Sequence, residues 1–178
     1  MELLKGSMIH SKLDDFFATM LSEMYWSEKN LINVLTTMAN AATETELQEA
    51  FNAHKSETET HVRRLEQVFT LLGIPAEPVP SIGLQGLFDE GWQVIDETDE
   101  GSAQRDVALI IAAQKVEHYE MSCYGSLVTL ARTLGQKEAA DLLAETLQEE
   151  KETDAKLTII AESHINEEAS QEPAAAGH

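Results

Sequence analysis

The 178-residue sequence has one cysteine, Cys123, few basic residues and no long hydrophobic run. A single cysteine cannot close an intramolecular disulfide, so oxidation does not staple the fold, and a reducing compartment suits the composition. Charges interrupt every apolar stretch before the roughly 18 residues that a membrane span needs, and the N-terminus lacks a basic region followed by an apolar run and a cleavage site. We therefore expect a cytoplasmic protein that does not cross a membrane.

Positive charge is scarce. The sequence has 32 acidic and 12 basic residues, which give a formal net charge of −20. A protein with this charge repels phosphate backbones and anionic membrane surfaces, so neither nucleic acid nor membrane is an expected partner. The same field attracts cations, but most of these carboxylates form a solvated outer face, so charge alone does not identify a metal protein.

Helical periodicity runs through nearly the whole sequence, without strand-like alternation of useful length, and predicts an all-α fold. The first predicted helix runs from Ser11 to Asn40. A capping box at Thr43 and Glu46 would start the second, and Gly73 would end it. The last two helices are predicted over residues 103–134 and 136–165. Residues 1–166 would form one domain, and residues 167–178, rich in Ala, Glu, Ser and Pro, a disordered tail.

The connections between these helices indicate their topology. Short links join the first helix to the second and the third to the fourth, whereas residues 73–102 form a long connection with three prolines and several glycines. This segment is expected to be an extended crossover with a short helix, because Gly83, Gly86 and Gly91 weaken a longer one. The sequence thus predicts an antiparallel four-helix bundle with one long crossover, the connectivity of ferritin-like folds.

A charged residue interrupts the apolar repeat at the same depth in each of the four predicted helices. The positions are Glu28, about seventeen residues into its helix, and Glu57, Glu117 and Glu150, each about fourteen residues into theirs, so every one lies roughly 20 Å from an end of its helix at 1.5 Å per residue. Antiparallel helices bring side chains together only where these lie at matching heights. Because an ionised carboxylate leaves water at a cost of several kcal/mol unless it is protonated, paired or cation-bound, the shared depth predicts a metal site.

The expected site holds two metal ions. Residues four apart share a helix face, so Glu57 can act with His61, and Glu150 with Asp154. The expected ligands are Glu28, Glu57, His61, Glu117, Glu150 and Asp154. This set is rich in carboxylate and poor in nitrogen, which suits iron or manganese better than structural zinc. Two such ions could share the electrons that reduce dioxygen or peroxide. The sequence identifies no catalytic residue.

Alternatives to this ligand set remain open. The polar level could instead be a layer of shared protons and hydrogen bonds that fixes helix register. His54 is either a ligand or, as we prefer, a hydrogen-bond donor to a ligand, and Glu120 is the best substitute ligand. Gln114 and Tyr124, on the face of Glu117, are expected to hydrogen-bond to ligands rather than bind metal.

Two longer segments resemble a known family. The segment from Ala112 to Glu120 and the segment from Glu145 to Asp154 are similar to the characteristic motifs of the YciE/YciF-like ferritin-like family, and His54, Glu57-Thr58 and Ser27-Glu28-Lys29 agree with it. The resemblance covers residues 14–161. It implies a ferritin-like bundle, usually dimeric, in bacterial proteins associated with stress responses, whose reaction is poorly defined.

The sequence departs from the wider ferritin and rubrerythrin pattern, which has Glu-x-x-His on two helices. Here Glu57 and His61 are four apart, and Asp154 stands where a histidine is expected. We therefore expect a homodimeric stress-response protein with a di-iron or di-manganese centre and possible ferroxidase or peroxide-consuming chemistry. The alternative is a non-enzymatic structural or interaction protein of the stress response with a vestigial metal site.

Overall fold

The computed structural model describes residues 11–173, which are helical almost throughout and contain no strand. The all-α fold class predicted from the sequence is therefore confirmed. The elements in chain order are α1 (Lys12–Ala41), α2 (Thr45–Leu72), α3 (Ile82–Glu97), α4 (Ala103–Thr133), α5 (Lys137–Ile160), the π-helical turn η1 (Ala161–Ile165) and α6 (Asn166–Gln171). None of these helices is long and apolar enough to cross a membrane.

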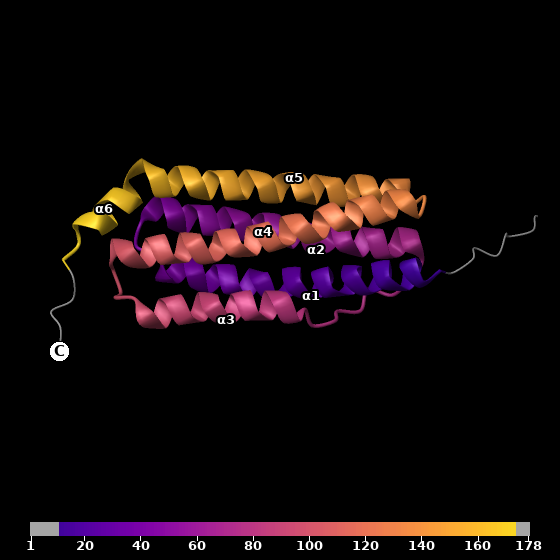
Figure 1. Ribbon diagram of the computed structural model, residues 1–178, viewed down its shortest axis with the longest axis horizontal. Coiled ribbons are helices and arrows are strands. Elements are labelled where there is room, and N and C mark those ends of the chain that lie inside the picture. Colours follow the sequence, from indigo (N-terminus) through magenta and orange to yellow (C-terminus); the bar gives the residue numbers. More distant parts are fainter. Residues whose placement is uncertain (1–10, 174–178) are drawn as a thin grey trace, which may run out of the picture.

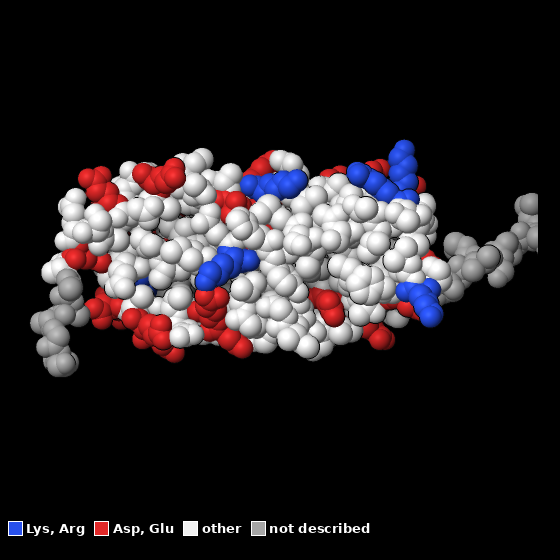
Figure 2. All heavy atoms as spheres, viewed as in Figure 1, with Lys and Arg blue, Asp and Glu red and all other residues white. Residues whose placement is uncertain are grey.

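The four long helices α1, α2, α4 and α5 run side by side (Figure 1). Each contacts two others, in the cyclic order α1, α2, α5, α4. The shorter α3 packs on α4 and α1 and lies outside this ring. The connection through α3 leads the chain from the end of α2 back along the molecule to the start of α4. Figure 2 shows acidic side chains scattered over this face, with several near the end where α3 passes into α4.

The start of α1 is fixed by its own sequence. The Ser11 hydroxyl accepts a hydrogen bond from the backbone N–H of Asp14, and the Asp14 carboxylate accepts one from the backbone N–H of Ser11 at 2.7 Å. This capping box satisfies amides that a helix leaves unpaired. The observed helix agrees with the predicted range to within one residue.

The start of α2 differs from the prediction. The helix begins at Thr45 without a side-chain cap, so the capping box expected at Thr43 and Glu46 is wrong. The buried carboxylate of Asp106 in α4 instead accepts hydrogen bonds from the backbone N–H groups of Thr43 and Glu44, each at 2.8 Å. Asp106, which is 62 residues from Glu44 and 63 residues from Thr43 in the sequence, thus caps α2 in place of a local side chain.

The crossover helix α3 has 16 residues and includes all three glycines that were expected to keep it short. The Ser81 hydroxyl caps it by accepting from the backbone N–H of Leu84. Gly83 has a packing role, because a Cβ atom there would lie 2.7 Å from the Tyr119 ring. Leu84 and Phe88 are buried beneath the helix, and this burial offsets its low intrinsic propensity.

The C-terminal segment is more ordered than its composition suggested. Residues 166–171, of which 167–171 fall in the predicted disordered tail, form α6. Two contacts hold this end: Ile165 is fully buried, and the Glu172 carboxylate accepts from the backbone N–H groups of Ala103 and Gln104 at 2.7 and 3.0 Å. The sequence predicted that the last helix ends at residue 165, whereas helical structure continues through α6 to Gln171. Residues 174–178 of the predicted tail, and residues 1–10 of the predicted domain, lie outside the described residues.

The hydrophobic core consists of two clusters. One contains Leu31, Leu47, Leu109 and Leu157, and the other contains Leu21, Leu65, Leu127 and Leu143. Each long helix contributes to both, and its stretch between them supplies charged or polar side chains instead. The core is thus divided at mid-height by a polar level.

Candidate metal centre

Six buried ionisable side chains from the four long helices form this level. Glu28 comes from α1, His54 and His61 from α2, Glu117 and Glu120 from α4, and Glu150 from α5; none is more than 3% exposed. We call these six residues the buried cluster. His54 and His61 share a face of α2 because they are two helical turns apart, and Glu117 and Glu120 share a face of α4 because they are three residues apart.

The buried cluster contains two overlapping triads that share Glu150. Glu28, His61 and Glu150 form one, and His54, Glu117 and Glu150 form the other; within each, one ligand atom per residue lies within 4.8 Å of the others. The two oxygens of Glu150 face different histidines: Oε1 is 3.1 Å from His61 Nδ1, and Oε2 is 3.6 Å from His54 Nε2. Glu150 thus faces both triads, one with each carboxylate oxygen.

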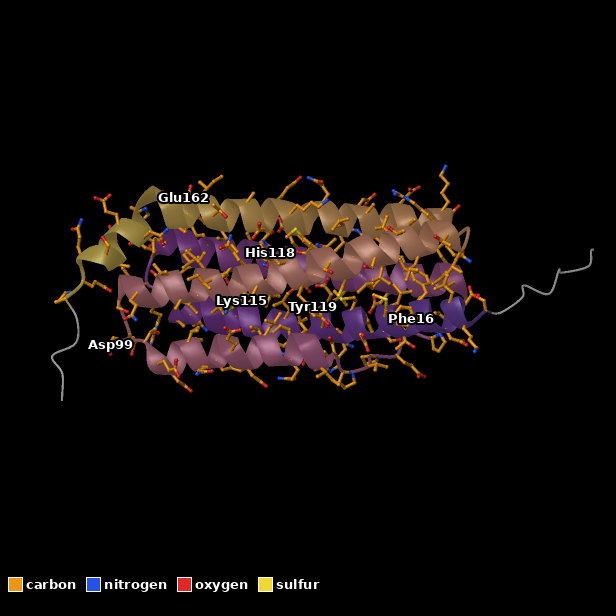
Figure 3. The ribbon with its side chains drawn as sticks, in the orientation of Figure 1. Phe16, Asp99, Lys115, His118, Tyr119 and Glu162 are labelled. Carbon is orange, nitrogen blue, oxygen red and sulfur yellow. The ribbon has the colours of Figure 1, made fainter. Side chains whose placement is uncertain are left out.

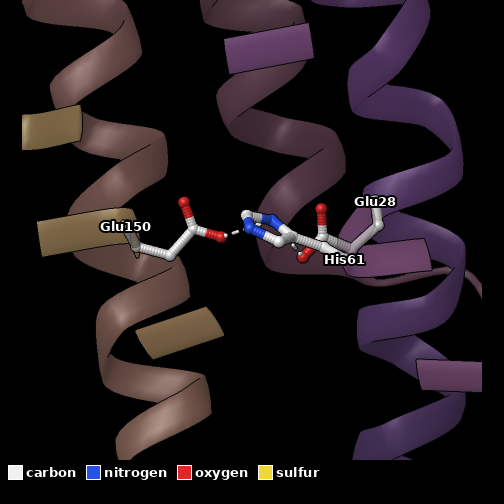
Figure 4. A group of neighbouring side chains, drawn as sticks. All are labelled: Glu28, His61 and Glu150. Atoms are coloured by element: carbon white, nitrogen blue, oxygen red, sulfur yellow. Dashed lines mark ion pairs between the residues drawn. The ribbon is translucent and has the colours of Figure 1, made fainter. Parts of the chain in front are cut away.

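Figure 4 shows the first triad in detail. The His61 imidazole lies between two carboxylates from different helices, with Nδ1 3.1 Å from Glu150 and 3.6 Å from Glu28. Its other nitrogen, Nε2, lies 3.0 Å from Glu149 Oε2. Glu149 is held in turn by Arg64, whose Nη1 donates at 2.6 Å and Nη2 at 3.1 Å. A neutral imidazole carries one proton, so in a metal-bound state this contact would favour that proton on Nε2 and would direct the Nδ1 lone pair into the cluster, as in many metal-bound histidines.

Tyr124 orients the carboxylate at the α1 side of the cluster. Its buried hydroxyl donates a hydrogen bond to Glu28 Oε1, as the sequence predicted for a residue on this face of α4. The second oxygen of Glu28 has no hydrogen-bond partner. The Tyr124 bond therefore fixes the carboxylate while leaving one oxygen free for another interaction.

The buried polar atoms without hydrogen-bond partners in residues 11–173 are all at this level. They are Glu28 Oε2, both ring nitrogens of His54, Thr58 Oγ1, His61 Nδ1, Glu117 Oε2, both oxygens of Glu120 and both oxygens of Glu150. Native proteins leave only a few such atoms per hundred residues, because each costs about 1–3 kcal/mol. The unpaired atoms are thus concentrated at one level between two apolar clusters, where they could hold a metal ion.

The charges in the cluster perturb one another strongly. Burial, followed by the charges of Glu150 and Glu120, raises the pKa of Glu117 well above its ordinary value, and burial with the charges of Glu28 and Glu150 does the same to Glu120. Burial also raises the pKa of Glu28. Burial acts to lower the pKa of His61, but the Glu28 charge and the bond to Glu150 raise it to about 11.

Glu150 shifts in the opposite direction. Burial acts to raise its pKa, but the imidazoles of His54 and His61 lower it to about 2. Without metal, therefore, these shifts favour the protonated forms of Glu117, Glu120 and His61. Bound cations would displace these protons.

Four of the six predicted ligands are in the buried cluster, namely Glu28, His61, Glu117 and Glu150. Glu57 is not: its side chain is exposed, and its Oε2 lies 3.4 Å from the Thr153 hydroxyl. The predicted inward stripe of α2 placed Glu57 between His54 and His61, but the buried residue at that position is Thr58. The buried face of α2 at this height is therefore one residue away from the predicted face.

Asp154 is also outside the buried cluster. Thr153 and Glu150 are buried on α5, whereas Asp154 is 22% exposed and accepts from Gln114 Nε2 at 3.2 Å. It lies 3.3 Å from Nε2 of His118, which Figure 3 labels and which is 66% exposed. Asp154 therefore belongs to a network at the α4 and α5 surface.

His54 and Glu120 lie in the buried cluster, whereas Glu57 and Asp154, which were expected there, do not. Both were considered from the sequence, His54 as a donor to a ligand and Glu120 as a substitute ligand. The signal for Glu120 was its spacing of three from Glu117, and the signal for His54 was its spacing of seven from His61, which in a helix returns to the same face.

The donor set fits a pair of divalent cations. Four carboxylates carry four negative charges, and the two imidazoles supply neutral nitrogens. The same numbers of carboxylates and histidines bind the metal pair in ferritin-like carboxylate proteins, although there the histidines come from two helices and here both come from α2. A ligand set dominated by oxygen favours iron or manganese over soft metals. The buried Glu and His side chains can thus hold a metal ion.

Comparison with known proteins places this site in a family context. Residues 12–170 match the family model described as "Domain of unknown function (DUF892)". Protein YciF of Escherichia coli (strain K12) is 42% identical over 158 residues, which cover 88% of this chain and 95% of that protein. The crystal structure of the E. coli stress protein YciF aligns with a TM-score of 0.83 over 88% of this chain and 99% of that one. YcfI, described as a putative structural protein from Rhodopseudomonas palustris, aligns with a TM-score of 0.81 at 31% identity, over 85% of this chain and 96% of that one.

Proposed function

The chain belongs to the DUF892 family and is similar to YciF over most of its length, and from this premise we propose that it is a cytoplasmic stress-response protein that binds two divalent metal ions. This membership confirms the resemblance predicted from the two sequence segments. The proposed ions are iron or manganese. The proposed ligands are Glu28, His54, His61, Glu117, Glu120 and Glu150.

One observation carries the proposal. Glu150 belongs to both buried triads, and each of its oxygens faces a different histidine. A single metal ion would use one triad and leave the unpaired atoms of the other unexplained. Two ions bridged by Glu150 account for both.

The proposed chemistry is the oxidation of Fe(II) coupled to removal of an oxidant. Two iron ions bound here would supply the two electrons that, with two protons, reduce one peroxide molecule to two water molecules. The protein's contribution is to hold the carboxylates at fixed positions, to orient the His61 ring through the contact of Nε2 with Glu149, and to pack the site between the two apolar clusters.

The architecture is part of the proposal. We infer that α1, α2, α4 and α5 form a ferritin-like antiparallel four-helix bundle, with α3 in the long crossover. The cyclic contacts of the four helices and the position of the site between them support this topology. We also propose a homodimer, as the family resemblance implies.

Consumption of oxidant tests the function. Protein loaded anaerobically with two Fe(II) per chain is mixed with hydrogen peroxide or dioxygen, and the consumed oxidant is measured. The isosteric Glu150→Gln variant should lose this activity while retaining its helical circular dichroism. Glu59→Gln, an exposed substitution on α2, is the matched control and should retain it. Equal activity in the Glu150→Gln variant contradicts the proposal.

A structural role is the second candidate function. Because the His61 imidazole lies between Glu28 and Glu150, protons alone can neutralise part of the negative charge of the buried cluster. The relative YcfI is also described as a putative structural protein. Cells that carry Glu150→Gln and survive stress as well as the wild type would support this candidate. Stress sensitivity equal to that of a deletion strain would support the metal site.

A further inference from the structure

A cleft of about 190 Å³ opens between α2 and α5 and reaches the buried cluster. Its outer wall carries Glu57, Glu152 and Lys156, and its inner wall carries His54 and Thr153. We call it the α2/α5 cleft. Of the six residues in the buried cluster, His54 is the one that lines it. The cleft therefore connects the surface with one of the two triads.

His54 faces both the cleft and the buried carboxylates. Its side chain is 3% exposed, yet neither ring nitrogen has a hydrogen-bond partner. Nδ1 lies 3.4 Å from Glu117, and Nε2 lies 3.6 Å from Glu150. A buried imidazole with two unpaired nitrogens at the inner end of a cleft is suited to receive a cation there.

The outer part of the cleft is acidic. Glu57 and Glu152 are exposed, and the Thr153 hydroxyl donates from α5 to Glu57 Oε2 at 3.4 Å, so the carboxylate of this α2 residue is held at the α5 side of the cleft. Glu149 also lines the cleft, but Arg64 and His61 already bind it. One cation, Lys156, opposes these carboxylates. Negative charge in a concave, partly enclosed site concentrates cations from solvent.

The other surroundings of the buried cluster carry fewer groups that a cation could use. The two hydrophobic clusters close the level from above and below along the helix axes. A wider groove between α1 and α4 has no charged residue in its lining, which consists of Phe16, Met20, Met121, Ser122, Gly125, Ser126, Thr129 and Leu130. Of these two openings in residues 11–173, the α2/α5 cleft is the one that offers carboxylates and an imidazole to a hydrated divalent ion.

We propose that the α2/α5 cleft is a transit site for divalent cations, where Glu57 takes the ion from solvent and His54 delivers it to Glu117 and Glu150. This inference rests on the proposed function, because it supplies the route to the same metal centre. It also gives Glu57 a role: the carboxylate is positioned to bind an incoming ion for a short time, because its partner is a neutral hydroxyl and its side chain remains exposed.

The rate of Co(II) loading tests the proposal. Metal-free protein is mixed with Co(II) in a stopped-flow instrument, the visible absorption of bound Co(II) is followed, and the final Co(II) content per chain is measured. Glu57→Gln should slow loading about fivefold to tenfold and weaken its dependence on salt, because a carboxylate that steers the ion is lost. The final content should remain two. Glu59→Gln, on the same helix but outside the cleft, should load as the wild type does.

A steric variant provides a second, independent test. Ala53 lines the cleft and is exposed, so Ala53→Trp should fill the cleft without changing any charge. It should slow loading and leave the final content at two. Wild-type rates in both Glu57→Gln and Ala53→Trp would overturn the transit site while leaving the metal centre intact. Loss of one ion in Glu57→Gln would also overturn it, because Glu57 would then be a permanent ligand. A wild-type protein that takes up no Co(II) would instead contradict the proposed function.

Discussion

Replacement of Glu120 by methionine should have opposite effects with and without metal. Glu120 is fully buried, and neither carboxylate oxygen has a hydrogen-bond partner. Burial and the charges of Glu28 and Glu150 raise its pKa well above the ordinary value, which favours the neutral acid, with both oxygens unsatisfied, in the metal-free protein. Methionine has a similar length and no polar atom that needs a partner. The Glu120→Met substitution should therefore stabilise the metal-free protein.

The size of this effect follows from the unpaired atoms. Removal of an unsatisfied buried polar group gains about 1–3 kcal/mol. The entropy of unfolding of 178 residues is about 0.4 kcal/mol/K, so the Tm of the metal-free protein should rise by about 3–8 °C. Metal acts in the other direction: each ion at a hundredfold excess over its Kd stabilises the wild type by about 2.7 kcal/mol, or about 7 °C. Glu120→Met should lose at least one of these two increments.

Thermal unfolding followed by circular dichroism, in chelator and then in excess Mn(II), measures both effects. Leu127→Met is the matched control, because Leu127 is fully buried on the same helix two turns from Glu120. This control should lower stability by less than about 1.5 kcal/mol and keep the full metal increment. The reasoning is refuted if metal-free Glu120→Met is less stable than the control, since the carboxyl group would then be a structural part of the layer.

Three further predictions concern the scaffold and pH. Asp106→Ala removes both hydrogen bonds to the start of α2 and should lower the free energy of unfolding, measured in urea, by about 2–4 kcal/mol. The metal content should not change. A loss of less than about 1 kcal/mol would show that the cap is dispensable. Gly83→Ala brings a Cβ atom to 2.7 Å from the Tyr119 ring and should lower the free energy of unfolding by about 1–3 kcal/mol. Gly86→Ala, whose Cβ would have no neighbour within 4 Å, should raise it by about 0.5–1 kcal/mol. Equal effects of the two variants on unfolding in urea would contradict the packing role of Gly83. The pKa of His61 is raised from 6.5 to about 11, so its contribution to metal-free stability is complete below pH 6.5 and is lost as pH rises toward 11. The Tm of the metal-free protein should thus fall between pH 7 and 10, and metal binding should release protons that a pH indicator detects; a Tm that rises over this range would contradict the assignment.

The depth of the site was predictable from the sequence because each long helix switches from apolar to charged residues at one height. Glu28, Glu117 and Glu150 interrupt otherwise regular apolar stripes, and the structure places all three in the buried cluster. Helix boundaries were also predictable where the caps are local, as at Ser11 and Gly73.

The exact face of α2 and α5 was not predictable. A period of 3.6 residues allows spacings of three or four, so His54, Glu57 and His61 fit one stripe as readily as His54, Thr58 and His61. Only packing against α5 decides between them. The sequence likewise could not predict that Asp106 caps the start of α2 and Glu172 the start of α4, because these caps depend on which helix ends meet in the folded chain.

The metal content of the purified protein distinguishes a two-ion centre from a metal-free polar layer. Untagged protein from cells supplied with iron and manganese is analysed by elemental mass spectrometry, together with its Glu57→Gln and Glu150→Gln variants. The account predicts about two ions per chain in the wild type and in Glu57→Gln, because Glu57 lies outside the buried cluster, and loss of both in Glu150→Gln, because Glu150 joins the two triads. Folded wild-type protein that contains no metal and binds no Fe(II) under anaerobic conditions would contradict it.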